Sequence, residues 1–235
     1  EWRKLSKLIK IKNKKLVSIF TSSEYERNPQ EEYNRFTGNN ILESVKYLFE
    51  KNIFSNDYKL VLRAHPHLKG RDLEYQKKIE NICKKYDVLF IPAHSPIDSY
   101  KLVNASDICI SFGSTISAEA SLLMKTSISI GKSLFKEFDC VFTPNSLVEL
   151  KDFLSNNLSE TYFVEKQFNA LKYFSTLYDF SNSILNEKFY FLELSFLIKK
   201  FFVFFLKKFY TTKNKIVNLT LKIFGKKVIK DKFYY

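Results

Sequence analysis

Short apolar runs alternate with helix-like segments along most of this chain, and this alternation constrains the fold more than any other feature. Runs rich in Ile, Val, Leu and Phe indicate buried strands, and the segments between them carry apolar residues at helical spacing. Strands that alternate with helices through short connections predict a parallel sheet with helices on both faces. The expected strands are 15–20, 59–66, 88–92, 107–112, 126–131 and 140–144, and the expected helices are 40–51, 72–86, 95–106, 114–124 and 146–154.

Chemistry-bearing side chains follow four of these strands. They lie in segments 21–26, 65–67, 94–99 and 113–115. In parallel sheets of this kind, ligands bind beyond the carboxyl ends of the strands. We therefore expect the four segments to form one site at one edge of the sheet.

The segment 107–120 holds a strand-like run that breaks at Gly113. Ser114 and Thr115 follow where a helix is expected to start, and Glu119 comes one turn later. A glycine lets the backbone turn sharply and approach a ligand, and a helix start offers free N–H groups to an anion. Two interpretations of the hydroxyl pair stay open at this point: an ordinary helix cap, or donation to the phosphate oxygens of a nucleotide.

Charge is divided unevenly along the 235 residues. The formal net charge is +13, to which residues 1–15 and 187–235 contribute +6 and +9, while 16–186 contributes −2. A nucleic-acid-binding domain would concentrate positive charge on its folded body, so we expect no nucleic-acid partner. Basic ends rich in aromatic residues favour an anionic membrane surface instead.

We divide the chain into a basic lead segment (1–15), a Rossmann-like domain (16–185) and a basic, aromatic, helical tail (186–235). Lysines interrupt the tail too often for a helix that spans a bilayer. Its composition favours an amphipathic helix lying in the membrane plane, with the lysines reaching the headgroups. The alternative is a helix packed against a domain that this sequence lacks. The membrane interpretation predicts a cytoplasmic protein held peripherally at the inner face of the plasma membrane.

The cysteines and histidines do not form a recognisable metal motif. Cys83, Cys109 and Cys140 lie in apolar surroundings without CxxC spacing, which is typical of reduced core residues in an intracellular protein. The three histidines come without an HExxH pattern or carboxylates at ligand spacing. We therefore predict no metal site and no cofactor.

Three short motifs occur in order after the expected strands: Arg63–Pro66 (RAHP), Ser95–Tyr100 (SPIDSY) and Gly113–Ala120 (GSTISAEA). With these motifs, residues 16–154 resemble the carboxyl-terminal, donor-binding half of GT-B glycosyltransferases, and within them the bacterial capsule polysaccharide biosynthesis group. The resemblance implies a metal-independent transferase in bacterial surface polysaccharide assembly. Its partners would be a nucleotide-sugar donor, which acts as a substrate, and a polysaccharide or glycolipid acceptor.

The resemblance also implies roles for single residues. Ser114 and Thr115 would bind the donor phosphates, Glu119 would accept hydrogen bonds from the ribose hydroxyls, and Ser99–Tyr100 would line the base or ribose pocket. His65 would stabilise the departing nucleotide, because glycosyl transfer without a metal needs cationic or N–H donors at the leaving phosphate. The full set expected to bind the nucleotide is Arg63, His65, Ser99, Tyr100, Gly113, Ser114, Thr115 and Glu119.

GT-B enzymes take most of their acceptor site from a second, amino-terminal domain. This sequence starts at Glu1 without Met and holds one such domain, so we expect a fragment that lacks the acceptor half. Glu24 and Glu26 are the nearest candidates for a catalytic base, and Asp107 is expected to be a capping or turn residue. Two alternatives stay open. One is a non-catalytic, membrane-associated module, and the other is different chemistry on the same scaffold, by a CDP-polyol phosphotransferase of the teichoic-acid type or a nucleotide-sugar 2-epimerase.

Overall fold

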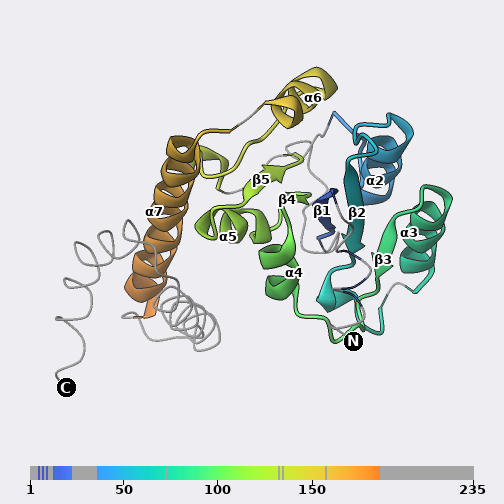
Figure 1. Ribbon diagram of the computed structural model, residues 1–235. Helices are drawn as coiled ribbons and strands as arrows, with labels where there is room; N and C mark the ends of the chain where they lie inside the picture. Colours follow the sequence, from blue (N-terminus) through green and yellow to red (C-terminus); the bar gives the residue numbers. More distant parts are fainter. Residues whose placement is uncertain are drawn as a thin grey trace. The chain divides into compact units, whose positions relative to one another are not determined.

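A five-stranded sheet forms the centre of the structure (Figure 1). The computed structural model describes residues 5, 7, 9, 13–22, 36–71, 73–131, 133, 135–156 and 158–185, with residues 179–185 described by their backbone alone. All neighbouring strands are parallel, in the order β3-β2-β1-β4-β5, which confirms the predicted α/β, Rossmann-like sheet. The strands are β1 (Lys15–Phe20), β2 (Tyr58–Arg63), β3 (Leu89–Ile91), β4 (Ile108–Ser111) and β5 (Thr126–Ser129).

Several of the helices begin at side-chain caps. Asn40 and Ser146 each accept a hydrogen bond from the backbone N–H three residues further on, at Glu43 and Glu149. Such caps satisfy N–H groups that have no partner inside the helix. The α-helices are α2 (Ile41–Glu50), α3 (Leu73–Lys85), α4 (Ser99–Ala105), α5 (Ile116–Leu122), α6 (Leu147–Ser155) and α7 (Glu160–Leu185), and the 3-10 helices are η3 (Pro66–Leu68) and η4 (Lys136–Phe138).

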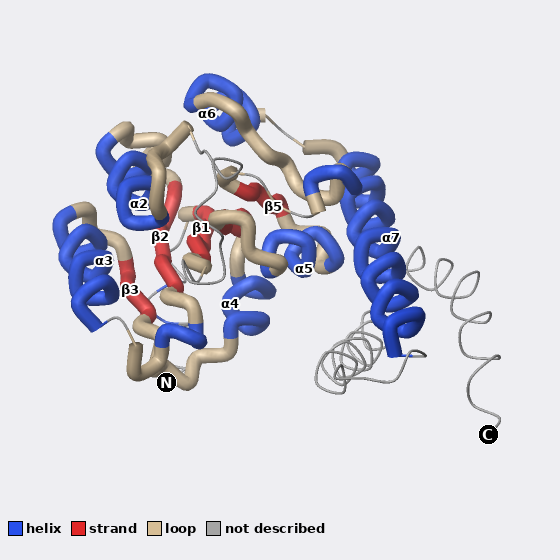
Figure 2. Tube along the Cα trace, turned by 180° about the vertical axis from the view of Figure 1, so that it is seen from behind, coloured by secondary structure: helices blue, strands red, loops and turns tan. Residues whose placement is uncertain are grey.

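Apolar side chains from the two faces of the sheet enter two cores. Along β1, Val17 and Ile19 belong to the larger core, whereas Leu16 and Phe20 belong to the smaller one, as the two-residue period of a strand requires. Buried residues of α2, α3 and α6 complete the larger core, and residues of α4 and α5 complete the smaller one (Figure 2). Both faces of the sheet are therefore covered, which explains why its strands are continuous apolar runs.

The predicted sixth strand at 140–144 is wrong. Only Phe142 pairs with the sheet, through one isolated bridge to Ile128 of β5. Asp139 before it has a left-handed backbone conformation (φ 49°), and Pro144 after it has no N–H to donate to a ladder. Leu73, the first residue of α3, is exposed although it is apolar. It lies six residues before Ile79 and is therefore turned away from the buried face.

The sequence pattern does not predict helix α7, which runs for 26 residues. Aromatic and polar residues are spread around it, so no apolar stripe marks it. Ser159 provides a start signal, because its hydroxyl accepts a hydrogen bond from the backbone N–H of Tyr162 (3.2 Å). Lys166 of α7 forms an ion pair with Asp139 (2.6 Å), and Tyr173 packs edge-on against Phe135.

Contacts within the chain divide it into two units, Glu1–Phe174 and Ser175–Tyr235. The predicted tail, 186–235, lies outside the described residues, as does most of the lead segment. Leu5 and Ile9 of the lead segment are described, and they are buried in the smaller core. No helix in the described part of the chain is both long and apolar enough to cross a membrane.

Three buried cysteines lie in different parts of the first unit. Cys83 is in α3, Cys109 is in β4, and Cys140 follows η4. Burial raises the pKa of the Cys83 and Cys109 thiols to about 12 and that of Cys140 to about 11. These thiols remain protonated at neutral pH and behave as core residues.

Candidate functional site

The carboxyl ends of β1 to β4, with the segments that follow them, form one edge of the sheet, here called the rim. The loop after β1 contacts its neighbours on both sides. The hydroxyl oxygen of Thr21 accepts a hydrogen bond from the backbone N–H of His65 (2.9 Å), and the hydroxyl of Ser22 donates to the carbonyl of Phe112 (3.0 Å). The strand order reverses at β1, which is where open α/β sheets bind ligands.

Arg63, the last residue of β2, is buried and holds the segment that follows β3. Its guanidinium donates to the backbone carbonyls of Pro92, Ser95 (3.2 Å) and Ile97 (3.3 Å). Burial lowers the pKa of Arg63. The described contacts of the guanidinium are all to protein carbonyls, whereas the sequence prediction places Arg63 against the nucleotide.

His65 lies two residues beyond Arg63 and is the N-cap of the 3-10 helix η3. Its Nδ1 accepts a hydrogen bond from the backbone N–H of His67 (3.3 Å), and the two rings meet edge-on with their centroids 4.8 Å apart. His65 is half-buried, while His67 is exposed. The structure therefore places the predicted catalytic histidine at the rim, with one ring nitrogen engaged in the local turn.

The second of the three motifs, 95–100, leads into helix α4. Asp98 caps this helix, with its carboxylate accepting from the backbone N–H groups of Tyr100 (2.7 Å) and Lys101 (3.4 Å). Ser99 is the first residue of the helix and is half-buried. The side chain of Tyr100 forms a hydrogen bond with the carboxyl of Glu119 on α5.

Gly113 makes the turn between β4 and α5 and has φ 75°, a conformation that favours glycine. Ser114 and the exposed Thr115 follow, as predicted. Thr115 is at the N-cap position without forming a side-chain cap, because its hydroxyl bonds to Glu119 instead. The ordinary-cap interpretation of Thr115 is therefore wrong.

A chain of neutral hydroxyls fixes α5 to the sheet. The hydroxyls of Ser111 at the end of β4 and Ser117 in α5 lie 2.6 Å apart. Ser117 also reaches the carbonyl of Ile128 (3.2 Å), and Ser127 of β5 donates to the carbonyl of Ser117 (2.6 Å). All three serines are buried. Ser111 and Ser117 were not predicted as site residues, because small polar residues in an apolar run give no distinct signal from sequence alone.

Glu119 joins the two predicted motif segments at the rim. Burial raises the pKa of its carboxyl to about 7, against the opposing effect of hydrogen bonds from Tyr100 and Thr115. Burial also raises the pKa of Tyr100, and the nearby Glu119 carboxylate raises it further. Tyr173 of α7 is affected in the same way, with its pKa raised to about 12 by burial first, then by the charges of Cys140 and Glu119. A group with a pKa near 7 can exchange a proton or accept a hydrogen bond at neutral pH.

Several predictions can be compared with the described residues directly. Asp107 was expected to be a capping or turn residue; the structure instead shows its carboxylate accepting from the backbone N–H of Leu16 at the start of β1 (2.7 Å). Glu24 and Glu26, the candidate bases, lie outside the described residues. Within the residues the structure describes, no group of three or more His, Cys, Asp or Glu side chains is placed to hold a metal ion.

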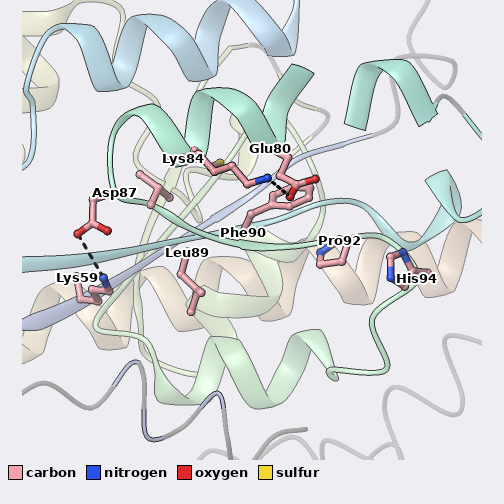
Figure 3. Close-up of a pocket in the computed structure, with 10 residues that line it drawn as sticks. Lys59, Glu80, Lys84, Asp87, Leu89, Phe90, Pro92 and His94 are labelled. Carbon is pink, nitrogen blue, oxygen red and sulfur yellow. Dashed lines mark ion pairs between the residues drawn. The ribbon is translucent and has the colours of Figure 1, made fainter. Parts of the chain in front are cut away.

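A hollow at the outer edge of β3 reaches the segment after this strand at Pro92 and His94 (Figure 3). Its charged side chains are paired, Lys84 with Glu80 (2.7 Å) and Lys59 with Asp87 (3.8 Å). None of the predicted nucleotide-binding residues line it. The residues that line it are Lys59, Glu80, Cys83, Lys84, Asp87, Val88, Leu89, Phe90, Pro92 and His94.

No protein-family profile and no curated protein matches the chain. Among solved structures, the chain is similar to the wall teichoic acid polymerase TagF (14% identity, TM-score 0.44, 74% of this chain and 42% of that one). It is also similar to MnaA from S. aureus in a structure with UDP (11%, TM-score 0.41, 66% and 39%). A third match is the β-Kdo 2,7-transferase KpsC from Thermosulfurimonas dismutans (15%, TM-score 0.41, 72% and 59%). The chain spans about two-fifths of the length of the first two and 59% of the third.

Proposed function

We propose that this chain supplies the nucleotide-binding half of a GT-B-type glycosyltransferase in bacterial surface polysaccharide assembly. The observation that carries the proposal is the meeting of Tyr100, Thr115 and Glu119, because it joins two of the three sequence motifs by side-chain hydrogen bonds. The remaining motif, RAHP, contributes His65, whose backbone N–H donates to Thr21 in the loop after β1 at the same rim. Motifs far apart in sequence thus converge where parallel sheets bind ligands.

Each rim residue has a chemical role in this proposal. The half-buried Glu119 would accept hydrogen bonds from the two ribose hydroxyls, and its ionised form is the better acceptor. Ser114 and Thr115 would face the phosphates across the Gly113 turn. His65 would donate to the leaving phosphate, where negative charge develops as the sugar departs. The proposal concerns the nucleotide and does not assign the sugar, the acceptor or the catalytic base.

Nucleotide binding measured by calorimetry tests this function. We expect one of CMP, CDP, UDP and GDP to bind the wild-type chain. The Ser114→Ala/Thr115→Ala and Glu119→Gln variants should weaken that binding by about 10- to 100-fold, the effect of losing hydrogen bonds to charged or ribose groups. Ser155→Ala is the matched control, because this exposed hydroxyl caps carbonyls at the end of α6 and should leave affinity unchanged.

The identity of the bound nucleotide separates the alternatives. UDP, GDP or CMP binding supports a sugar donor, whereas CDP binding favours a polyol phosphate donor. If the folded chain binds none of the four nucleotides, the proposed function is wrong, and the interpretation as a non-catalytic membrane module takes its place.

A further inference from the structure

Arg63 is predicted to bind the nucleotide, yet its guanidinium already donates to three backbone carbonyls. Its side chain is buried, with 3% of its surface exposed. It comes from the end of β2, yet its three described hydrogen bonds reach the segment that follows β3. A guanidinium has five N–H donors in a planar fork, so one arginine can hold several carbonyls at fixed positions.

The three accepting carbonyls lie just before helix α4. Pro92, Ser95 and Ile97 are followed by Asp98, which caps the helix and binds the backbone N–H of Tyr100. The backbone between Pro92 and Asp98 has no helix or strand of its own. The arginine holds this segment together with short local hydrogen bonds, such as that from the Ile97 N–H to the Ser95 hydroxyl (3.3 Å). The Ala93 N–H also donates to the Gln76 side chain (3.4 Å), and Ala93 and Ile97 pack against apolar clusters.

The start of α4 in turn sets the position of the Tyr100 hydroxyl. That hydroxyl bonds to Glu119, which belongs to α5 and is held to the sheet independently through Ser117. We propose that Arg63 is a positioning residue, which holds segment 92–97 so that the Tyr100 hydroxyl stays against the Glu119 carboxyl. The step from this contact to nucleotide affinity rests on the proposed function, whereas the contact itself does not.

A titration of Glu119 in the ligand-free chain tests the proposal. The groups that face Glu119 are Tyr100 of α4, Thr115 of α5 and Tyr173 of α7. The carboxyl is followed by carbon-13 NMR in glutamate-labelled protein, with its signal assigned by its loss in Glu119→Gln. Removing the Tyr100 donor in Tyr100→Phe should raise the Glu119 midpoint by about one pH unit, because the ionised carboxylate loses a hydrogen bond.

Arg63→Lys keeps the positive charge but removes the planar fork. If Arg63 acts through Tyr100, this variant raises the Glu119 midpoint by about half a pH unit or more. The double variant Arg63→Lys/Tyr100→Phe then matches Tyr100→Phe alone, because the arginine has no other route to Glu119. Arg71→Lys, a change at an exposed arginine, is the matched control and leaves the midpoint in place.

The outcomes separate this inference from the proposed function. An Arg63→Lys variant that is less stable but keeps the wild-type Glu119 midpoint overturns the positioning role, as do additive shifts in the double variant. If Glu119 responds as expected while no nucleotide binds, the positioning role stands and the proposed function fails.

A second variant covers the case in which Arg63→Lys does not fold. Asp98 is exposed, and Asp98→Ala releases the same helix start from the other side. This variant should also raise the Glu119 midpoint. Loss of the negative charge of Asp98 by itself would lower the midpoint, so the direction of the shift identifies the cause. An unchanged or lowered midpoint in Asp98→Ala overturns the proposal.

Discussion

Two sides of the rim are held in different ways. On the arginine side, which comprises Arg63 and segment 92–97, one buried cation donates to three backbone carbonyls. On the serine side, which comprises Ser111, Ser117, Ser121 and Ser127, neutral hydroxyls bond to one another and to carbonyls of α5 and β5. On the arginine side a single side chain therefore donates to all three carbonyls, whereas the serine side distributes its hydrogen bonds over four side chains.

The difference follows from what each side must hold. Segment 92–97 is neither helix nor strand, so no regular backbone pattern supplies donors for its carbonyls, and side chains have to supply them. Helix α5 already satisfies most of its own backbone groups, so small hydroxyls are enough to fix it against β4 and β5. Glu119 and Tyr100 link the two sides, with Tyr100 carried by the helix that the arginine side leads into.

The largest effect should come from Arg63→Met, which tests whether the arginine side depends on one residue. Three half-buried carbonyls lose the arginine as a donor, and of these the Pro92 carbonyl keeps the backbone N–H of Ser95 (3.0 Å). Each lost bond costs about 1 kcal/mol or more, and relief of the buried charge offsets part of this. We expect the free energy of unfolding, measured in urea, to fall by about 3 kcal/mol. Arg71→Met, on the exposed surface, serves as the control. A fall in the free energy of unfolding of less than about 1 kcal/mol would show that the arginine side does not rely on Arg63.

The next effect concerns the link between the sides and depends on pH. The pKa of Glu119 is about 7 in the folded chain and 4.5 as its ordinary value. Its contribution to stability is fully present below pH 4.5, is lost as pH rises from 4.5 to about 7, and is absent above that range. Glu119→Gln should remove this decline, which amounts to about 2 to 3 kcal/mol between pH 4.5 and 8. Equal slopes of stability against pH in the variant and the wild type would contradict the raised pKa of the Glu119 carboxyl.

The smallest effect should come from Ser117→Ala on the serine side. The substitution leaves the Ser111 hydroxyl and the Ile128 carbonyl without one partner each, while Ser127 still bonds to the Ser117 backbone. We expect a loss of about 1 to 2 kcal/mol in thermal or urea unfolding. Ser155→Ala, at an exposed position of α6, should change stability by less than about 0.5 kcal/mol. A loss as large as that of Arg63→Met would remove the contrast between the two sides.

The sequence predicted the five strands and the helices between them, because each is a short apolar run or a capped amphipathic segment. It also predicted that the motif segments meet at one rim, which follows from the parallel order of the strands. Helix α7 was not predicted, because its apolar residues form no stripe along one face. Segment 140–144 was wrongly predicted to be a strand, because an apolar run does not show whether a strand pairs along its whole length. The shared bond between Tyr100 and Glu119 could not be predicted, because it depends on how two helices are placed across the sheet.

The role of Arg63 shows the same limit at a single residue. An arginine before a histidine and a proline at a strand end is a reasonable phosphate ligand from sequence alone. Whether its guanidinium binds a ligand or three backbone carbonyls depends on the path of segment 92–97. The local sequence does not determine that path. The predicted assignments of Glu24, Glu26 and the tail concern parts outside the described residues and stay predictions.

The three buried cysteines make local opening of this fold measurable. Since their thiols stay protonated while the fold is closed, an alkylating reagent modifies them only as often as the surrounding structure opens. The alkylation rate of Cys83 would report the opening of α3, and that of Cys109 the opening of the central sheet. The rate at Cys140 would report the opening of the segment that follows η4. Mass spectrometry of the three labelled peptides would thus give three separate opening rates from one chain without any substitution. Each cysteine would report the opening of its own region.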